Sequence, residues 1–299
     1  MFIFLKLFRQ KVSLYWKEKG GKMMGRKRIT ELFPWLLPFR KWERKLFFYG
    51  NMRLDANTYS WRKSEERLRY LCYRWESVII NPDTGHDIKF QINKEHNLRL
   101  ACETLDGLVI RPGETFSFWQ RVRYAEQKEA YRDGLSQVNG NIVYTRGGGL
   151  CQLSNELFWC FLHTPLTIVE RHSHGVQEFP AAFQGKPVGT DAVVSEGWLD
   201  LKMRNDTSIT YQIIAEVCDG ILITEIWCDR PVVDKYEIFA RDVRYVSKNG
   251  EVLQYAKLYR RIWDVRRAEI PRAEHWLYEN RTKIGYELPK DCIVEEMKG

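Results

Sequence analysis

The chain has 299 residues, of which 44% are hydrophobic and 14% aromatic, so it can bury a sizeable core and is not a disordered protein. Its formal net charge of +8 favours an acidic partner such as nucleic acid, anionic lipid or an anionic polymer. Its seven cysteines are odd in number and form no CxxC pair, which argues against a disulfide framework or a zinc ribbon. This usage is typical of reduced thiols in a cytosolic compartment.

Residues 1–24 have two interpretations. They begin with a short apolar run, which Lys6 and Arg9 interrupt well before the ~20 residues that span a bilayer. No small-residue cleavage site follows, so we expect neither a signal peptide nor a transmembrane helix, and a cytoplasmic location. Either the segment is a basic amphipathic helix associated with an anionic membrane surface, or Gly20-Gly21 is a translated ribosome-binding site and 1–24 is a leader before a mis-annotated start.

Residues 25–93 are predicted to form a basic, aromatic and helical extension. Pro34 and Pro38 break its first half, and apolar residues at helical spacing predict a helix at about 60–79: Trp61, Leu68, Leu71, Cys72, Trp75 and Val78. Basic residues interleaved with aromatic ones also suit single-stranded nucleic acid, but no nucleic-acid fold motif accompanies them. Nucleic acid is therefore not an expected partner, whereas an anionic membrane surface is a candidate.

Short elements follow. A helix is predicted near 94–106, with Gly107 as its natural end, and a strand at 108–110. Residues 115–119 alternate like a strand. The polar stretch 120–145 is expected to form a loop-rich wall of an active site or groove.

Three consecutive glycines, Gly147, Gly148 and Gly149, precede a predicted helix over 150–163, whose apolar stripe is Leu150, Leu153, Leu157 and Phe161. Cys151 therefore lies in the first turn of this helix, where free backbone N–H groups and the positive end of the helix dipole favour a thiolate. A thiolate is the form of cysteine that acts as a nucleophile or metal ligand. The alternative is that Cys151 packs as a small hydrophobic residue and the glycines only form a turn.

The rest of the chain reads mainly as strands, expected at 166–170, 199–204, 209–217 and 221–228. The strand at 199–204 is expected to be half-buried, because apolar and charged residues alternate along it. A basic, exposed hairpin is predicted over 236–264, and an irregular tail after it. The predicted fold class is α+β, with N-terminal helices, a central helix after a Gly-rich turn, and a C-terminal antiparallel sheet.

Motifs between residues 97 and 228 resemble the VanW family, named for an accessory protein of B-type vancomycin-resistance clusters. They are Asn97-Leu98-(x2)-Ala101, Pro112 to Phe118, Tyr131 with Gly134, Gly147 to Leu157, Glu170-Arg171-(x2)-His174, and Gly189 to Val194. We accordingly interpret 94–230 as a VanW-like domain and 231–299 as a basic β-hairpin and irregular tail. The resemblance implies a link to cell-wall peptidoglycan and to glycopeptide (vancomycin) resistance. The family usually has Thr where this chain has Asn155, and His172 is additional to its pattern.

The first functional hypothesis is a cysteine-dependent enzyme that performs acyl transfer or amide hydrolysis on a cell-wall peptide or precursor. Cys151 is its nucleophile, His174 its general base and Asp191 the group that orients the imidazole. The backbone of Gly147–Gly149 is a candidate source of oxyanion donors. Gln152 and Arg171 are expected to contact the substrate.

The second hypothesis is a binding module without chemistry, in which the glycine turn, Tyr131 and Arg132 line a groove for a wall glycan, peptide or precursor. The third is a metal site formed by Cys151, His172, His174 and Asp191; it is the least favoured, because a glycine turn is a loose place for a ligand. No cofactor and no metal are therefore expected.

Overall fold

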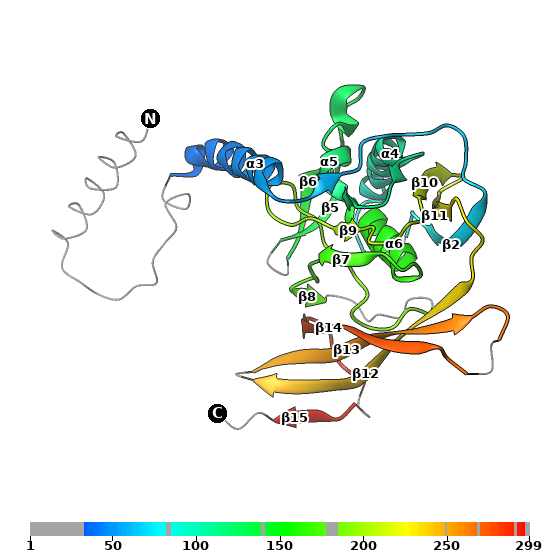
Figure 1. Cartoon of the computed structure of the whole chain (residues 1–299). Coiled ribbons are helices and arrows are strands. Elements are labelled where there is room, and N and C mark those ends of the chain that lie inside the picture. The colour runs from blue at the N-terminus through cyan, green and yellow to red at the C-terminus, as the bar shows by residue number, and fades with distance from the viewer. Residues whose placement is uncertain are drawn as a thin grey trace. The chain divides into compact units, whose positions relative to one another are not determined.

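The computed structural model describes residues 33–81, 85–138, 141–177, 185–248, 250–267, 270–289 and 292–296. The chain forms two compact units, residues 1–47 and 48–299. Helices and strands alternate irregularly along it (Figure 1), which confirms the α+β class. The predicted leader at 1–24 lies outside the described residues. None of the helices described combines the length and apolar character needed to cross a membrane.

The first described elements are the short helix η1 (Pro34–Leu36) and the helix α3 (Leu37–Leu54). Pro38 is tolerated because it falls in the first turn of α3, where a backbone N–H has no partner within the helix. The end of α3, from Phe48 onward, belongs to the second unit. There, the Tyr49 hydroxyl donates to Glu196 Oε1 at 3.0 Å and Met52 is buried.

The helix predicted at about 60–79 is wrong, since this stretch forms the strand β2 (Tyr70–Val78). Pairing of β2 with its neighbour shifts register at Cys72, so an extra residue bulges out of the ladder there. Because of this extra residue, the inward-facing side chains of β2 do not alternate regularly with a period of two. Cys72 and Trp75 are instead three positions apart, which is also a helical spacing. Leu71 and Val78, expected to face inward, are 41% and 67% exposed.

One four-stranded antiparallel sheet has the order β2, β11 (Ile221–Cys228), β10 (Tyr211–Cys218) and β3 (Val109–Ile110). The hairpin β10–β11 confirms the two predicted strands and their turn. Helix α4 (Ile88–Leu105) packs against β10, and α6 (Cys151–Leu162) packs against β11 and β2. The carboxylate of Asp87 caps α4 by accepting from the Lys89 N–H at 2.9 Å, so α4 begins six residues before the predicted start.

A second sheet has the order β1 (Thr58–Tyr59), β4 (Glu114–Ser117), β9 (Lys202–Arg204) and β7 (Thr167–Glu170). The strand predicted at 115–119 stops early because Ser117 accepts from the Gln120 N–H and starts the helix α5 (Phe118–Val122), which the short helix η3 (Ala125–Gln127) follows. The stretch at 199–204 is not half-buried as predicted, since Asp200 and Lys202 are buried too. Strands β5 (Asp133–Val138) and β6 (Asn141–Arg146) form a separate hairpin.

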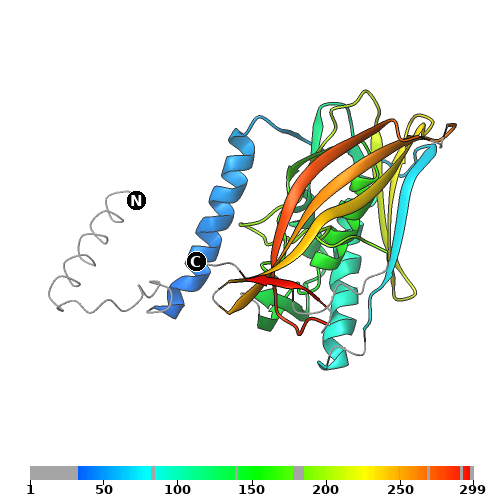
Figure 2. The same cartoon turned by 90° about the horizontal axis from the view of Figure 1, so that it is seen from below.

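The C-terminal sheet has the order β15 (Val294–Glu296), β12 (Asp234–Lys248), β13 (Glu251–Asp264), β14 (Ala273–Ile284) and β8 (Val176–Gln177). Its three long strands are antiparallel and lie side by side, coloured yellow to red in Figure 2. They confirm the predicted hairpin and the C-terminal antiparallel sheet. The expectation of an irregular tail is wrong, because residues of this stretch form the strand β14, which pairs antiparallel with β13.

Helix α6 belongs to the core of the second unit. The side chains of Leu153, Leu157 and Phe161 are fully buried, as the 3.6-residue spacing predicts. The helix ends where Pro165 cannot continue it, with the His163 N–H donating back to the Cys160 carbonyl. Because the body of α6 is fixed by packing, its first residue, Cys151, is held in a defined place.

Candidate functional site

The glycine turn before α6 packs closely on the hairpin β5–β6. A Cβ atom at Gly148 would lie 2.3 Å from the backbone of Gly134, and one at Gly147 would lie 3.2 Å from the ring of Tyr131. Gly147 and Gly149 also have φ values of +75° and +96°, which residues with side chains rarely adopt. Glycine is thus required here for backbone geometry and close approach.

Backbone donors of this turn already have partners. The Gly147 N–H donates to the Arg132 carbonyl and the Gly148 N–H to the Thr145 carbonyl, each at 3.0 Å. Asn97 fixes the same turn, because its Nδ2 donates to the carbonyls of Arg132 and Gly148. In this conformation the first two glycines therefore offer no N–H to an oxyanion, and donors would have to come from the residues that follow.

Cys151 is the first residue of α6 and is partly exposed. Its Sγ donates to the Val194 carbonyl at 3.8 Å, and its own carbonyl accepts from the Ser154 hydroxyl. The Ser154 hydroxyl also donates to the Ala192 carbonyl at 2.6 Å, and Asn155 Oδ1 accepts from the Ala192 N–H at 2.6 Å. The first turn of α6 is thereby joined to the segment 191–194, which also carries Asp191.

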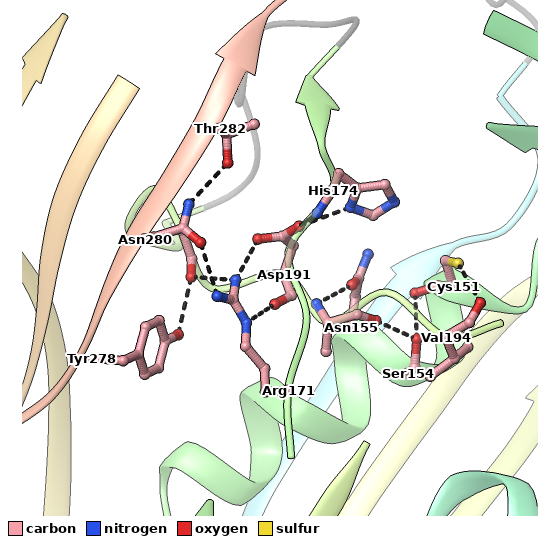
Figure 3. Close-up of polar contacts among 12 residues, drawn as sticks. Cys151, Ser154, Asn155, Arg171, His174, Asp191, Val194, Tyr278, Asn280 and Thr282 are labelled. Carbon is pink, nitrogen blue, oxygen red and sulfur yellow. Dashed lines mark hydrogen bonds and ion pairs between the residues drawn. The ribbon is translucent and has the colours of Figure 1, made fainter. Parts of the chain in front are cut away.

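His174 and Asp191 form a close pair next to this turn. His174 Nδ1 lies 2.8 Å from Asp191 Oδ2, and the His174 backbone N–H donates to the same oxygen at 2.6 Å. These two hydrogen bonds to one carboxylate oxygen fix the orientation of the His174 ring. They place a proton on Nδ1, so that Nε2 can interact with another partner. In Figure 3 the ring extends from Asp191 on the side where Cys151 lies.

Arg171 holds the other oxygen of this carboxylate. Its side chain is only 8% exposed, and its Nη2 lies 2.6 Å from Asp191 Oδ1 while its Nε donates to the Asp191 carbonyl at 2.6 Å. Nη2 also donates to the Gly189 carbonyl at 2.9 Å. The remaining nitrogen, Nη1, donates to Asn280 Oδ1 on β14 at 2.8 Å (Figure 3). The guanidinium also lies over the ring of Tyr278, 4.7 Å from its centroid.

The charges in this cluster support one another. Burial by itself would lower the pKa of His174, but hydrogen bonds to Asp191 and Cys151 raise it to about 10. Burial would raise the pKa of Asp191, but His174 and the Arg171 guanidinium hold it below its ordinary value. The side chains of His174 and Asp191 remain 28% and 26% exposed. The cluster thus holds a charged imidazolium that solvent can reach.

His172 does not join this cluster. Its Nε2 lies 3.0 Å from Glu170 Oε1, and Glu170 Oε2 pairs with the Lys202 ammonium at 2.9 Å. Although burial opposes the charge on Glu170, hydrogen bonds from His172 and Lys202 lower its pKa to about 2. Within the described ranges, no three His, Cys, Asp or Glu side chains are grouped so that they could hold a metal ion, so the metal hypothesis gains no support.

The other expected contact residues lie around the turn or turn away from it. Tyr131 and Arg132 border the glycine turn, as the binding-module hypothesis expects of a groove wall. Gln152 turns toward β2, where its Nε2 donates to Ser77 Oγ at 2.6 Å and to the Val78 carbonyl at 3.2 Å. The donors of Arg171 all have partners within the protein, as described above.

Sequence reasoning missed Asn280 and Tyr278, which come from the stretch interpreted as an irregular tail. The signal was present: Tyr278, Asn280 and Thr282 alternate along β14, with Asn280 and Thr282 buried. Asn280 Nδ2 donates to Thr282 Oγ1 at 3.0 Å, and the Tyr278 hydroxyl donates to the Gly189 carbonyl at 3.0 Å. One face of β14 is therefore a polar surface turned toward Arg171.

A cysteine at a helix N-terminus, an imidazole and a carboxylate held by arginine thus define a cysteine–histidine–aspartate site in an α+β fold. The family model described as "VanW like protein" matches residues 93–227. The vancomycin B-type resistance protein VanW of Enterococcus faecalis (strain ATCC 700802 / V583) is 44% identical over 273 residues, which are 91% of this chain and 99% of that protein. The chain therefore belongs to the VanW family.

A second relative covers less. The uncharacterized protein YoaR of Bacillus subtilis (strain 168) is 33% identical over 135 residues, or 45% of this chain and 43% of that protein. No solved structure matches the chain significantly.

Proposed function

We propose that the chain is a cysteine-dependent enzyme of glycopeptide resistance, which performs acyl transfer or amide hydrolysis on a cell-wall peptide or its precursor. The observation that carries the proposal is the position of His174, which Asp191 holds through Nδ1 on the side where Cys151 lies (Figure 3). Support for the biological setting comes from the relative named as a vancomycin B-type resistance protein.

The cluster supplies a role for each group. With a pKa of about 10, His174 is protonated at neutral pH, so it has a proton to donate next to Cys151. Asp191 keeps the imidazole oriented and stabilises its charge. The hydrogen bonds described for Arg171 do not include Cys151 or His174. Arg171 therefore acts by positioning the Asp191 carboxylate.

In the proposed reaction the Cys151 thiolate attacks the carbonyl carbon of an amide, which forms a C–S bond. Collapse of the tetrahedral adduct breaks the C–N bond, and His174 donates its proton to the leaving amine. Water or an acceptor amine then attacks the thioester carbon and gives a proton to His174. Collapse of this second tetrahedral adduct breaks the C–S bond and restores the Cys151 thiolate and the His174 imidazolium. Water gives hydrolysis and an amine gives acyl transfer.

A non-catalytic binding module is the second candidate, and specific observations favour it. The N–H groups of Gly147 and Gly148 are already bonded, and the Cys151 thiol donates to a backbone carbonyl. Under that reading, Tyr131 and Arg132 border a recognition groove for a wall peptide, glycan or precursor.

The two candidates are separated by trapping the acyl-enzyme. The full chain is incubated with a wall stem peptide and its lipid-linked precursor, and intact mass is recorded after acid quenching. We expect a mass increase equal to the acyl part, located on Cys151, which is absent in Cys151→Ala and strongly reduced in His174→Gln, because the variant lacks the proton donor for the leaving amine. Cys218→Ala removes an exposed thiol on β10 and is the matched control.

Labelling with iodoacetamide gives an independent measurement. Cys151 should react faster than Cys218, and His174→Gln should slow its labelling at neutral pH while leaving the rate of Cys218 unchanged. If Cys151 labels no faster than Cys218, no adduct forms, and Cys151→Ala retains peptide binding, then the enzyme proposal fails and the binding module replaces it.

A further inference from the structure

The net positive charge of the chain comes from its first 54 residues. Residues 1–54 contain 14 Lys and Arg against 3 Asp and Glu, a net +11, whereas the other 245 residues have 33 basic and 36 acidic side chains, a net −3. Within this basic part, α3 alone carries five basic side chains and one acidic one. A field of one sign that is limited to one segment indicates a local anionic partner.

Helix α3 also has an exposed apolar stripe. Phe39, Trp42 and Leu46 follow the spacing i, i+3, i+7 and are 56%, 57% and 54% exposed. The rings of Phe39 and Trp42 are 5.9 Å apart, so the stripe is continuous. Trp35, in the helix η1 just before α3, is 74% exposed.

Most of the basic side chains lie on the opposite side of the helix. At 100° per residue, Arg40, Lys41 and Arg44 are roughly 125–170° from the centre of the stripe and Lys45 is about 90° from it, at its border; all four are exposed. The acidic Glu43 pairs with Arg40 at 2.8 Å. An aromatic and aliphatic face opposite a Lys- and Arg-rich face is the pattern of a helix that lies in a membrane interface.

We propose that the first three turns of α3 bind an anionic lipid surface, with Phe39, Trp42 and Leu46 inserted at the headgroup boundary and the basic residues among the headgroups. A second copy of the chain is a poorer occupant, because the stripe covers only two turns and a coiled coil needs three to four heptads. Dimerisation would also bring like charges together. The end of α3, with Tyr49 and Met52, belongs to the second unit (residues 48–299), so binding through the first turns of the helix would tether that unit to the membrane.

The test is co-sedimentation of the full chain with vesicles of phosphatidylcholine alone or mixed equally with phosphatidylglycerol. We expect binding to the mixed vesicles that weakens with added salt, and little binding to phosphatidylcholine. The triple variant Phe39→Gln, Trp42→Gln, Leu46→Gln should lose most binding. Lys41→Glu with Lys45→Glu should lower the binding constant at least about 25-fold, roughly fivefold for each basic side chain removed.

Matched control variants distinguish binding by this surface of α3 from nonspecific adsorption to vesicles. Trp276→Gln removes another exposed aromatic residue, 61% exposed on β14, and Arg266→Glu with Arg267→Glu makes the same change in charge on an exposed turn. Both should bind as the parent does, and all variants should keep its melting temperature. The proposal is overturned if the parent ignores anionic vesicles, if the triple variant binds equally well, or if that variant instead converts a dimer to a monomer in sedimentation velocity. The proposal that α3 binds an anionic lipid surface does not depend on the chemistry at Cys151.

Discussion

Replacement of Asn280 by alanine tests whether the C-terminal sheet holds the site. Asn280 is 3% exposed and accepts one of the four hydrogen bonds that Arg171 donates, at 2.8 Å. Loss of a hydrogen bond from a charged donor costs about 1.5–3 kcal/mol, and loss of the bond to Thr282 costs about 1 kcal/mol more. We therefore expect Asn280→Ala to lower the free energy of unfolding by about 3 kcal/mol, which lowers Tm by on the order of 8 °C.

The functional effect of Asn280→Ala should follow from the same contact, because Asn280 has no described bond to Cys151 or His174. If half of the lost free energy is needed to keep Asp191 against His174, labelling of Cys151 slows roughly tenfold. Asn280→Asp keeps an acceptor for Arg171 and should restore most of the rate. Glu279→Ala, on the exposed side of β14, is the control. Equal labelling rates in Asn280→Ala and Glu279→Ala, with the expected loss of stability in the first, would refute a positioning role and leave only a structural one.

Three further outcomes are expected. The pKa of His174 is raised from 6.5 to about 10, so its contribution to stability is fully present below about pH 6.5 and is lost as pH rises through about 10; His174→Gln should flatten this fall in urea unfolding curves. Gly148→Ala should destabilise the fold by about 3 kcal/mol or more because its Cβ would meet the Gly134 backbone, whereas Gly175→Ala, with nothing within 4 Å, should change Tm little. Leu157→Ala should cost about 3 kcal/mol in denaturant unfolding, since Leu157 is fully buried.

The elements predicted correctly are those whose signal is local. The stripe of α6 and the turns of the hairpins β10–β11 and β12–β13 depend on spacing and turn residues within a few positions. Strand β2 was missed because its bulge at Cys72 breaks the period of two, and only pairing with β11 decides between helix and strand. The tail was missed because the residues that alternate on the inward face of β14 are polar, so their pattern does not resemble that of a buried strand, and pairing with β13 decides the structure.

The candidate site divides in the same way. Cys151 could be singled out from the glycine turn and the helix that follows, and His174 and Asp191 from the family motifs. The bond between Arg171 and Asn280 could not be predicted, because Asn280 lies 109 positions further along the chain. A hydrogen bond across that separation depends on how the sheet packs, which no spacing in the sequence encodes.

The bond between Arg171 and Asn280 bears on how freely this domain can be moved between proteins. The region that the family model matches ends at residue 227, yet the arginine that secures its carboxylate needs an acceptor on a strand beyond that boundary. A gene fusion or excision that carried only residues 93–227 would leave a buried cation without one of its acceptors. A transferred domain would therefore be less stable unless its new neighbour offered an oxygen at the same place.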